Sequence, residues 1–469
     1  MPLFWRKREE PEVEVRKRVN PPKVVALSFL AAILFGSVLL SLPFASSSGR
    51  GIAYIDALFT ATSSTCVTGL VVKDTGSDFS LFGQIVIILL IQVGGLGIMT
   101  LSTFFLLLFG RRISLRDSIT VRLSFGERGV RNTGQVIKSA LVLTFAVELA
   151  GAAVLFWRFH SGPERLAIGK AAYYGIFHSV AAFCNAGFST FSANLVGQEW
   201  PVVITLGILL VLGGIGFVVL YNVLNLRFWR KDRLVRGRLS LQSKAVLLST
   251  AALIGMGFIL FLILEWNRGM GGQRIGERLV NSFFCSVTPR TAGFNTIDYA
   301  KMSSPGILLS MFLMFIGASP GSTGGGIKTC TFVVLLVTAY AIMHGRQNVV
   351  LFRRTIPYRV VQEAMAVALI SLLLVGVAAV ALSVSEREGS GWGNCEAGYA
   401  ARTTFEVISA FGTVGLSTGI TPYLSVVGKA ILILTMYAGR VGPLTLALIV
   451  AGREPAPAVE YPEESTMIG

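Results

Sequence analysis

The stretch FTATSSTCVTGL, residues 59–70, decides the fold because the pattern at its end recurs three times along the chain. The recurrences are CNAGF (184–188), RTAGF (290–294) and GTVGL (412–416), and in each a glycine precedes Leu or Phe. A short apolar segment of about 8–13 residues lies before each stretch, at residues 55–64, 171–183, 279–287 and 403–411. A spanning helix takes roughly 20 residues, so the sequence predicts four short re-entrant helices, each followed by a loop.

Long apolar segments flank these short ones. Of the 469 residues, 53% are hydrophobic and 14% charged, and the mean hydropathy is +0.68, which favours lipid over water as the solvent. We therefore expect eight spanning helices, within residues 24–42, 79–110, 139–157, 200–226, 245–264, 302–327, 364–384 and 430–452.

The spacing between glycines also repeats. Gly69 and Gly94 are 25 residues apart, and Gly187 and Gly213 are 26 apart. In the second half of the chain the corresponding intervals, 293 to 317 and 415 to 439, are both 24 residues. Matched intervals of this kind indicate a repeat architecture.

The predicted fold class is an all-α membrane protein of four tandem helix–pore helix–helix repeats, with pseudo-fourfold symmetry around one pore. The predicted boundaries are a cytoplasmic N-terminal segment (1–23), repeats at 24–115, 116–235, 236–346 and 347–452, and a cytoplasmic C-terminal tail (453–469).

The repeated loops have the properties of a cation filter. Non-helical backbone at membrane depth persists only where protein buries it or water lines it. Four such loops around one axis present carbonyl oxygens that replace a cation's hydration shell. Glycine permits positive φ, so successive carbonyls point the same way, and the C-terminal ends of the short helices favour a cation. A single glycine in a membrane helix is more often a close-packing site, but four in matched contexts favour a filter.

The segment GASPGSTGGG, residues 317–326, interrupts the second long segment of the third repeat. Each interior Gly costs ~1 kcal/mol and Pro ~3 kcal/mol relative to Ala, so we expect an irregular gating loop rather than a simple kink. Arg440 aligns, by the repeat offsets, with Gly95, Gly214 and Ala318, and it is the only charged residue of the four. An arginine near the midplane costs at least ~2.5 kcal/mol and needs a role or a partner.

Two roles for Arg440 stay open. In one, it points into a cavity below the filter, contacts residues 317–326 and places a positive barrier in the ion path. In the other, it pairs with Glu148 or with backbone carbonyls. Lys328, which ends the broken segment, binds loop carbonyls or reaches the cytoplasmic interface.

The net charge of +16 reflects topology rather than nucleic-acid binding. If the N-terminus is inside, the cytoplasmic segments hold 26 of the 41 Lys and Arg residues and the opposite loops hold 12. This asymmetry fits the positive-inside rule, with both termini cytoplasmic and the basic loops in contact with anionic lipid.

The residue types that support enzyme chemistry are not clustered. The three histidines lie far apart, His178 is predicted to be a packing residue, and GSTGGGIKT is not a phosphate-binding loop. The sequence therefore predicts no metal centre and no enzyme activity. The five cysteines are expected to be free thiols: residues 66, 184, 285, 330 and 395.

The chain resembles the superfamily of Trk, Ktr and HKT potassium transporters, and within it the Ktr-type membrane subunit. The similarity covers about residues 21–452 and is most specific in FTATSSTCVTGL, VAAFCNAGFST, TPRTAGFNT, GASPGSTGGGIKT and SAFGTVGLSTG. In plant members, serine at the first filter position goes with sodium preference and glycine with potassium, so the glycine here implies potassium.

The resemblance also implies which residues form the site. The implied selectivity filter consists of Thr65, Cys66, Val67, Thr68, Gly69, Cys184, Asn185, Ala186, Gly187, Arg290, Thr291, Ala292, Gly293, Gly412, Thr413, Val414 and Gly415. Within it, Arg290 is alternatively an anchor behind the filter, because a permanent cation facing the path opposes conduction. The implied gate consists of Gly317, Ala318, Ser319, Pro320, Gly321, Ser322, Thr323, Gly324, Gly325, Gly326, Lys328 and Arg440.

The resemblance further implies a homodimer in a prokaryotic plasma membrane, on a cytoplasmic ring of nucleotide-binding subunits that responds to ATP or ADP. Potassium is the transported ion, sodium an activator, and no organic cofactor is expected on this chain. Two alternatives are a sodium-permeable member of the superfamily and an ion-coupled secondary transporter. The latter predicts inverted repeats and ionisable residues at the midplane.

Overall fold

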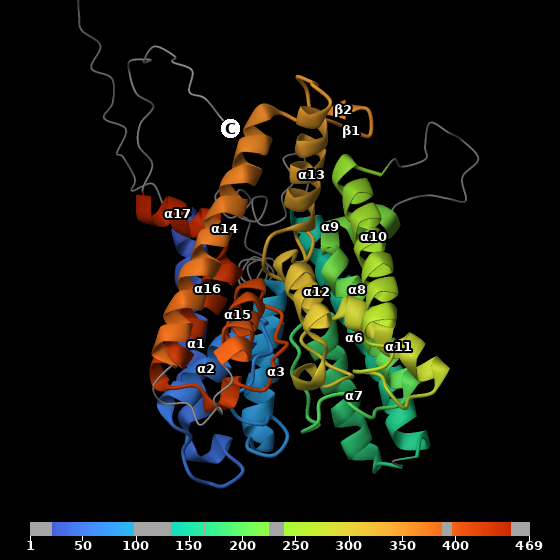
Figure 1. Ribbon diagram of the computed structural model, residues 1–469. Coiled ribbons are helices and arrows are strands. Elements are labelled where there is room, and N and C mark those ends of the chain that lie inside the picture. The colour runs from blue at the N-terminus through green and yellow to red at the C-terminus, as the bar shows by residue number, and fades with distance from the viewer. Residues whose placement is uncertain (1–20, 98–132, 164, 225–238, 387–395, 452–469) are drawn as a thin grey trace, which may run out of the picture.

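Most of the described chain is helical. The computed structural model describes residues 21–97, 133–163, 165–224, 239–386 and 396–451. Within these ranges the only strands are β1 (Val350–Leu351) and β2 (Arg354–Thr355), which form an antiparallel hairpin. The helices stand side by side, and the hairpin lies beyond the bundle at the top of Figure 1.

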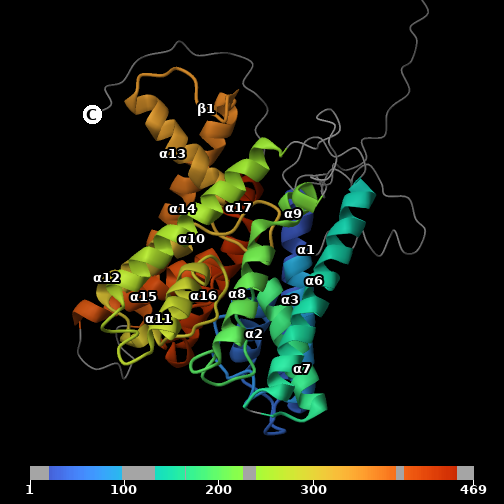
Figure 2. The same cartoon turned by 90° about the vertical axis from the view of Figure 1, so that its right-hand side faces the viewer.

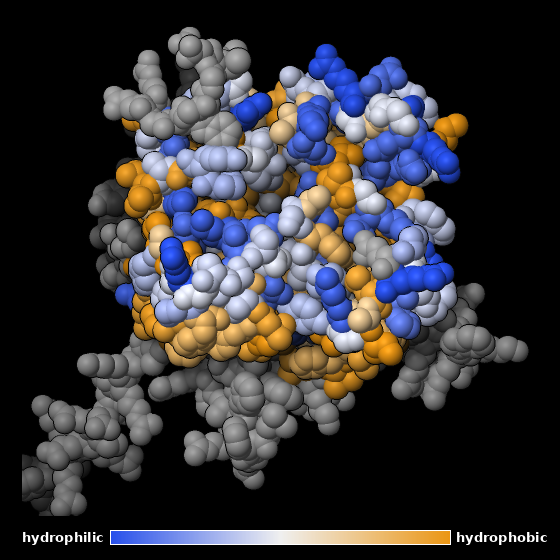
Figure 3. Space-filling view, turned by 90° about the horizontal axis from the view of Figure 1, so that it is seen from below, coloured by the Kyte–Doolittle hydropathy of each residue, from blue (hydrophilic) through white to orange (hydrophobic). Residues whose placement is uncertain are grey.

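Four of the described helices are long and apolar enough to cross a membrane: α1 (Pro21–Ser41), α6 (Thr133–Ser161), α10 (Leu241–Leu264) and α14 (Tyr358–Ser385). Only 22–39% of each apolar window is buried inside the protein. Large apolar side chains such as Phe35 (68% exposed) and Leu373 (69%) therefore face outward, as expected for contact with lipid tails. The end of the molecule seen from below has hydrophilic residues over much of its centre and hydrophobic residues along its rim (Figure 3).

Four shorter helices cover the predicted re-entrant segments: α2 (Tyr54–Thr65), α7 (Ile168–Phe183), α11 (Ile275–Val287) and α15 (Glu396–Gly412). Helix α15 begins before the predicted residue 403 and has 17 residues. Each short helix ends within three residues of one of the repeated loop motifs, so the structure places these motifs at the helix C-termini.

The second long segments of the second, third and fourth predicted repeats are interrupted, and only the interruption in the third was predicted from the sequence. Residues 200–226 contain α8 (Trp200–Ile215) and α9 (Phe217–Leu224), which meet at 96°. The other segments contain α3 (Leu81–Leu96), α12 (Ser304–Phe315) followed by α13 (Thr329–Met343), and α16 (Val426–Val441) followed by α17 (Pro443–Ala451). The part of segment 79–110 beyond residue 97 lies outside the described residues. The short α9 and the projecting α13 are visible in Figure 2.

Glycine pairs explain where these helices stop. Helices α3, α8 and α16 each end at a glycine with positive φ: Gly97 (+79°), Gly216 (+95°) and Gly442 (+95°). Three residues earlier, a second glycine packs against the carbonyl at the end of the neighbouring short helix. The pairs are Gly94 with Thr65, Gly213 with Phe183, and Gly439 with Phe411. A Cβ at any of these three glycines would overlap the carbonyl oxygen, so the repeated glycines set how closely two helices approach.

We expect Gly213→Ala to destabilise the protein by about 1–3 kcal/mol, because its methyl group would force α8 away from Phe183. The matched control is Gly255→Ala in α10, where a Cβ meets no atom within 4 Å. Apparent melting temperatures of the detergent-solubilised variants measure the difference. Equal melting temperatures for both variants would show that the close approach of α8 does not matter.

The helices of the four predicted repeats, each called a unit below, contact one another in a closed series. Each second helix packs against the short helix of the next unit: α3 against α7, α8 against α11, and α12 against α15. Helix α16 of the last unit packs against α2 of the first. Residues that are more than 350 positions apart in the sequence therefore complete the arrangement.

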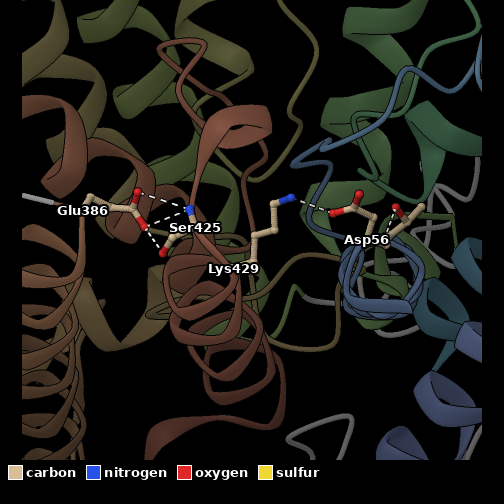
Figure 4. Close-up of polar contacts among 5 residues, drawn as sticks. Asp56, Glu386, Ser425 and Lys429 are labelled. Carbon is tan, nitrogen blue, oxygen red and sulfur yellow. Dashed lines mark hydrogen bonds and ion pairs between the residues drawn. The ribbon is translucent and has the colours of Figure 1, made fainter. Parts of the chain in front are cut away.

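An ion pair lies at the contact that closes this series. The Lys429 Nζ of α16 is 2.7 Å from the Asp56 Oδ1 of α2, and the two side chains are only 13% and 11% exposed. Figure 4 shows Lys429 reaching toward Asp56, while the preceding Ser425 donates its backbone N–H and its hydroxyl to Glu386 at the end of α14. The serine–glutamate contact recurs in the third unit, where Ser303 donates its backbone N–H and its hydroxyl to Glu265.

Removing one member of the Asp56–Lys429 pair should destabilise the protein by about 3 kcal/mol, because the remaining charge stays in a poorly hydrated contact. Asp56→Asn and Lys429→Gln test this separately through the apparent melting temperature. The double variant carries no unpaired charge and should regain most of the loss. A double variant no more stable than either single one would contradict this account.

Candidate functional site

The four repeated glycines meet at one place. A Cβ built on Gly69 would lie 3.0 Å from the Cα of Gly187, and one built on Gly187 would lie 2.8 Å from the Cα of Gly293. The circle continues from Gly293 to Gly415 (3.3 Å) and from Gly415 back to Gly69 (2.8 Å). The structure therefore brings together four loops that are separated by more than 100 residues each.

The oxygens at this point come from the residue before each glycine. The carbonyl of Ala186 faces Gly69, that of Ala292 faces Gly187, that of Val414 faces Gly293, and that of Thr68 faces Gly415. These are equivalent positions in the four motifs, and the surrounding loop residues are buried. A ring of neutral backbone oxygens suits a cation that sheds its water, since carbonyl dipoles replace the hydration shell.

The four loops also share a backbone conformation. Each glycine has positive φ: +96° at Gly69, +70° at Gly187, +76° at Gly293 and +91° at Gly415. Two residues earlier a non-glycine residue has positive φ as well: Val67 (58°), Asn185 (60°), Thr291 (70°) and Thr413 (49°). Non-glycine residues rarely adopt this conformation, so its recurrence at one motif position is a shared structural feature of the loops.

Hydroxyl groups near the ends of the short helices hold three of the loops. Ser63 accepts from the N–H of Gly69 (3.1 Å) and donates to the carbonyl of Leu70 (2.8 Å). Ser409 likewise accepts from the N–H of Gly415 (3.1 Å), and Thr288 donates to the carbonyl of Phe294. These three residues were not predicted from the sequence, although Ser63 and Ser409 both stand six positions before a loop glycine.

A second set of missed residues holds the chain just beyond the loops. Glu406 is fully buried and accepts hydrogen bonds from Ser417 (2.8 Å), Thr418 (2.8 Å from its N–H) and Thr421 (2.7 Å). His178 stands at the same offset from its loop glycine, hydrogen-bonds Ser189 (3.1 Å) and stacks on Phe191. It is a packing residue, as predicted. Both side chains fix the residue two positions after the glycine.

The predicted gating segment 317–326 lies against the base of these loops. The N–H of Gly325 donates to the Thr413 hydroxyl (3.0 Å), and the Thr323 hydroxyl donates to the carbonyl of Phe183 (3.5 Å). The segment also fills the break between α8 and α9. There the N–H of Ser319 donates to Gly214 (3.2 Å), and the carbonyl of Gly321 accepts from Phe217 (3.1 Å). The free backbone groups at the bend between α8 and α9 are thus paired with backbone groups of another unit, as non-helical backbone at membrane depth requires.

Two basic side chains, Arg440 and Lys328, bind backbone carbonyls of this segment. Arg440 donates to the carbonyl of Thr323 and to that of Gly94 at the end of α3. Lys328 donates to the carbonyl of Gly324 (2.7 Å). Arg440 therefore contacts both the predicted segment and backbone carbonyls, whereas among the described residues it forms no ion pair with Glu148.

Arg290 points away from the circle of glycines. Its guanidinium donates to the Thr250 hydroxyl of α10 (3.2 Å). This position agrees with an anchor behind the loop rather than with a residue that lines an ion path. The described cysteines, 66, 184, 285 and 330, are free thiols as predicted, while Cys395 lies outside the described residues. In the described ranges no group of three or more His, Cys, Asp or Glu residues is placed to hold a metal.

An apolar helical bundle in which four equivalent backbone carbonyls meet, next to an irregular segment bound by Arg440 and Lys328, is typical of a membrane transporter of cations. The chain belongs to the TrkH family of cation transport proteins, which it matches over residues 5–460. This family consists of transporters rather than enzymes, which agrees with the expectation from the sequence.

Several relatives support the assignment along nearly the full length. The chain is 40% identical to the potassium/sodium uptake protein NtpJ of Enterococcus hirae, over 97% of this chain and 98% of the relative. It is 37% identical to the Ktr system potassium uptake protein B of Bacillus subtilis (96% and 97%) and 38% identical to that of Vibrio alginolyticus (96% and 95%). The crystal structure of the potassium transporter TrkH from Vibrio parahaemolyticus has the same fold, with a TM-score of 0.68 at 20% identity over 95% of this chain and 86% of that one.

Proposed function

We propose that this chain is the pore-forming membrane subunit of a potassium uptake system. Its four units are repeats arranged with pseudo-fourfold symmetry around one pore, and the loops at residues 65–69, 184–187, 290–293 and 412–415 form the selectivity filter. The observation that carries the proposal is the ring of carbonyls from Thr68, Ala186, Ala292 and Val414. Glycine at all four ring positions and the potassium uptake activity named for three relatives support potassium as the ion.

The segment 317–326 acts as the gate in this proposal. It forms hydrogen bonds with the loop residue Thr413 and with Phe183 at the end of α7. It therefore lies where ions leave the filter. Arg440 and Lys328 place two positive charges at this point, both bound to carbonyls of the segment. Opening requires the segment to release these contacts, and the permanent charge of Arg440 opposes cation passage until it does.

The assembly is part of the same proposal. We infer a homodimer in a prokaryotic plasma membrane, with both termini cytoplasmic and a nucleotide-binding regulatory ring on the cytoplasmic side. Two relatives are named as proteins of a Ktr system, which supports the presence of a further component. The basic loops assigned to the cytoplasmic side by the positive-inside rule offer it a surface.

A sodium-permeable transporter is the second candidate. The relative from Enterococcus hirae is named for potassium and sodium uptake, and it is 40% identical to this chain. In that case sodium is a second substrate rather than an activator.

Rubidium uptake into liposomes containing the purified protein distinguishes these candidates, with empty liposomes as the control. Block by potassium but not by sodium would support a potassium-selective pore. Equal block by both ions would contradict potassium selectivity and favour the sodium-permeable candidate. Gly69→Ser tests the filter assignment in the same assay, and a sodium block that strengthens in this variant is the expected result.

A further inference from the structure

The second loop lacks the hydroxyl that holds its counterparts. Six residues before Gly187 the chain has Ala181, where the first and fourth loops have Ser63 and Ser409. The Ala181 carbonyl still accepts from the N–H of Ala186 (2.7 Å), as the Ser63 and Ser409 carbonyls do in their loops. What is missing is the side-chain bond to the glycine N–H that the first and fourth loops have, and His178 holds the chain only beyond this loop, at Ser189.

Support for this loop comes from behind it, through Cys184. Its thiol lies 3.8 Å from the Glu148 carboxylate of α6 and 3.7 Å from the Gln92 side-chain oxygen of α3. The Gln92 amide in turn donates to both carboxylate oxygens of Glu148, at 3.2 and 3.4 Å. Three side chains from three elements thus form a closed hydrogen-bonded group, in which Cys184 is fully buried and Glu148 is 5% exposed.

The position of Glu148 is itself fixed. Its carbonyl accepts a hydrogen bond from Ser179 of α7 (2.6 Å), one turn before the loop begins. A carboxylate at this depth is costly and persists only with a role or a partner. Its partners here are the loop thiol and a glutamine, and among the described residues it forms no ion pair.

We propose that Glu148 and Gln92 are positioning residues for ion discrimination, which hold the second loop through Cys184 in place of the missing hydroxyl. Cys184 stands two residues before Ala186, whose carbonyl belongs to the ring and faces Gly69. A displacement of Cys184 therefore moves one of the four ring oxygens. This inference rests on the proposed function, because it assigns the group to the filter of a potassium pore.

The group also connects the loop to the gate. Gln92 stands two residues before Gly94, whose carbonyl accepts from Arg440. The same turn of α3 thus bonds to the second loop through a side chain and to Arg440 through its backbone.

The test compares Glu148→Leu, which removes both acceptor oxygens, with Glu148→Gln, which keeps one. The readout is the ratio of sodium to potassium concentrations that half-block rubidium uptake. We expect this ratio to fall about tenfold in Glu148→Leu, the equivalent of ~1.4 kcal/mol, and to stay within about twofold of the parent in Glu148→Gln. Equal losses of the ratio in both variants would show that the charge of Glu148, rather than its hydrogen bonding, matters, and this would overturn the proposal. No loss in Glu148→Leu would overturn it as well.

A rescue variant separates loop positioning from general damage. Adding Ala181→Ser to Glu148→Leu supplies the hydroxyl found in the first and fourth loops and should restore most of the ratio. If Ala181→Ser does not restore the ratio, the proposal that the Glu148 group takes the place of the missing hydroxyl is wrong.

A second pair of variants covers the case in which Glu148→Leu does not fold. Cys184→Ala should lower the ratio and Cys184→Ser, which keeps a donor, should not; equal ratios would overturn the role of the thiol. Cys330→Ala, in α13, is the control for cysteine removal. If the parent protein does not prefer potassium, the proposed function is wrong. If the parent prefers potassium and the variants keep that preference, only the role of Glu148, Gln92 and Cys184 is wrong.

Discussion

Replacing Gly415 by alanine is expected to lower rubidium uptake at least about tenfold and to abolish the preference for potassium over sodium, since overpacking costs about 1–3 kcal/mol. The added methyl group would overlap the Thr68 carbonyl and lie 2.8 Å from the Cα of Gly69. It would therefore separate the fourth loop from the first and widen the ring of oxygens. Uptake by proteoliposomes, with potassium or sodium as competitor, measures both effects.

The chain supplies a matched control four residues later. Gly419 has nearly the same backbone conformation, with φ of +89° against +91°, but a Cβ there meets no atom within 4 Å. Gly419→Ala carries the same local strain of about 1–2 kcal/mol and should leave the ion preference unchanged. If both variants lose the preference, backbone strain rather than the contact between loops is responsible, and the ring assignment loses its support.

Neutralising Arg440 should have the second large effect, in the opposite direction. A permeating cation and the Arg440 guanidinium carry like charges, and such charges at a separation of about 8 Å repel by about 2 kcal/mol at an effective dielectric constant near 20. Arg440→Gln is therefore expected to raise rubidium uptake roughly tenfold or more. The variant also loses bonds to Thr323 and Gly94, which loosens the segment at residues 317–326. Initial uptake rates at equal protein content provide the measurement.

Arg440→Lys separates the two contributions. Lysine keeps the charge but cannot reproduce a planar fork that binds two carbonyls, so the barrier remains while one contact is lost. We expect its uptake to stay well below that of Arg440→Gln. Equal uptake in the two variants would assign the effect to the contacts alone, and unchanged uptake and ion preference in Arg440→Gln would refute the barrier.

The positions of the short helices and of the loop glycines were predictable, because motif and spacing recur in the sequence. For Arg290 the sequence left two positions open, in the filter or as an anchor behind it, and the contact of its guanidinium with Thr250 agrees with the anchor. The alignment of offsets singled out Arg440, but it left open whether this residue contacts the segment at residues 317–326 or pairs elsewhere.

The breaks in the second helices were not predicted outside the third unit. Residues 200–226 carry no charge, and hydropathy alone does not distinguish a straight helix from one bent by 96°. The decisive partners, Phe183 and Gly321, are distant in sequence. Glu406 and the hydroxyls of Ser63 and Ser409 were missed for a similar reason, since their roles depend on which backbone groups lie opposite them.

The interrupted helices have a consequence for how the protein is made. The 12 residues of α12 extend about 18 Å, well short of a bilayer core of about 30 Å, and α9 has only 8 residues. Neither piece can enter lipid alone, and the free backbone groups at the Gly216 break would be unpaired without Gly321 from a later part of the chain. We therefore expect the second hairpin to leave the insertion machinery with a continuous helix across the Gly216 break. Its bend then forms only when the hairpins associate, so a late event of biogenesis creates this irregular backbone at the centre.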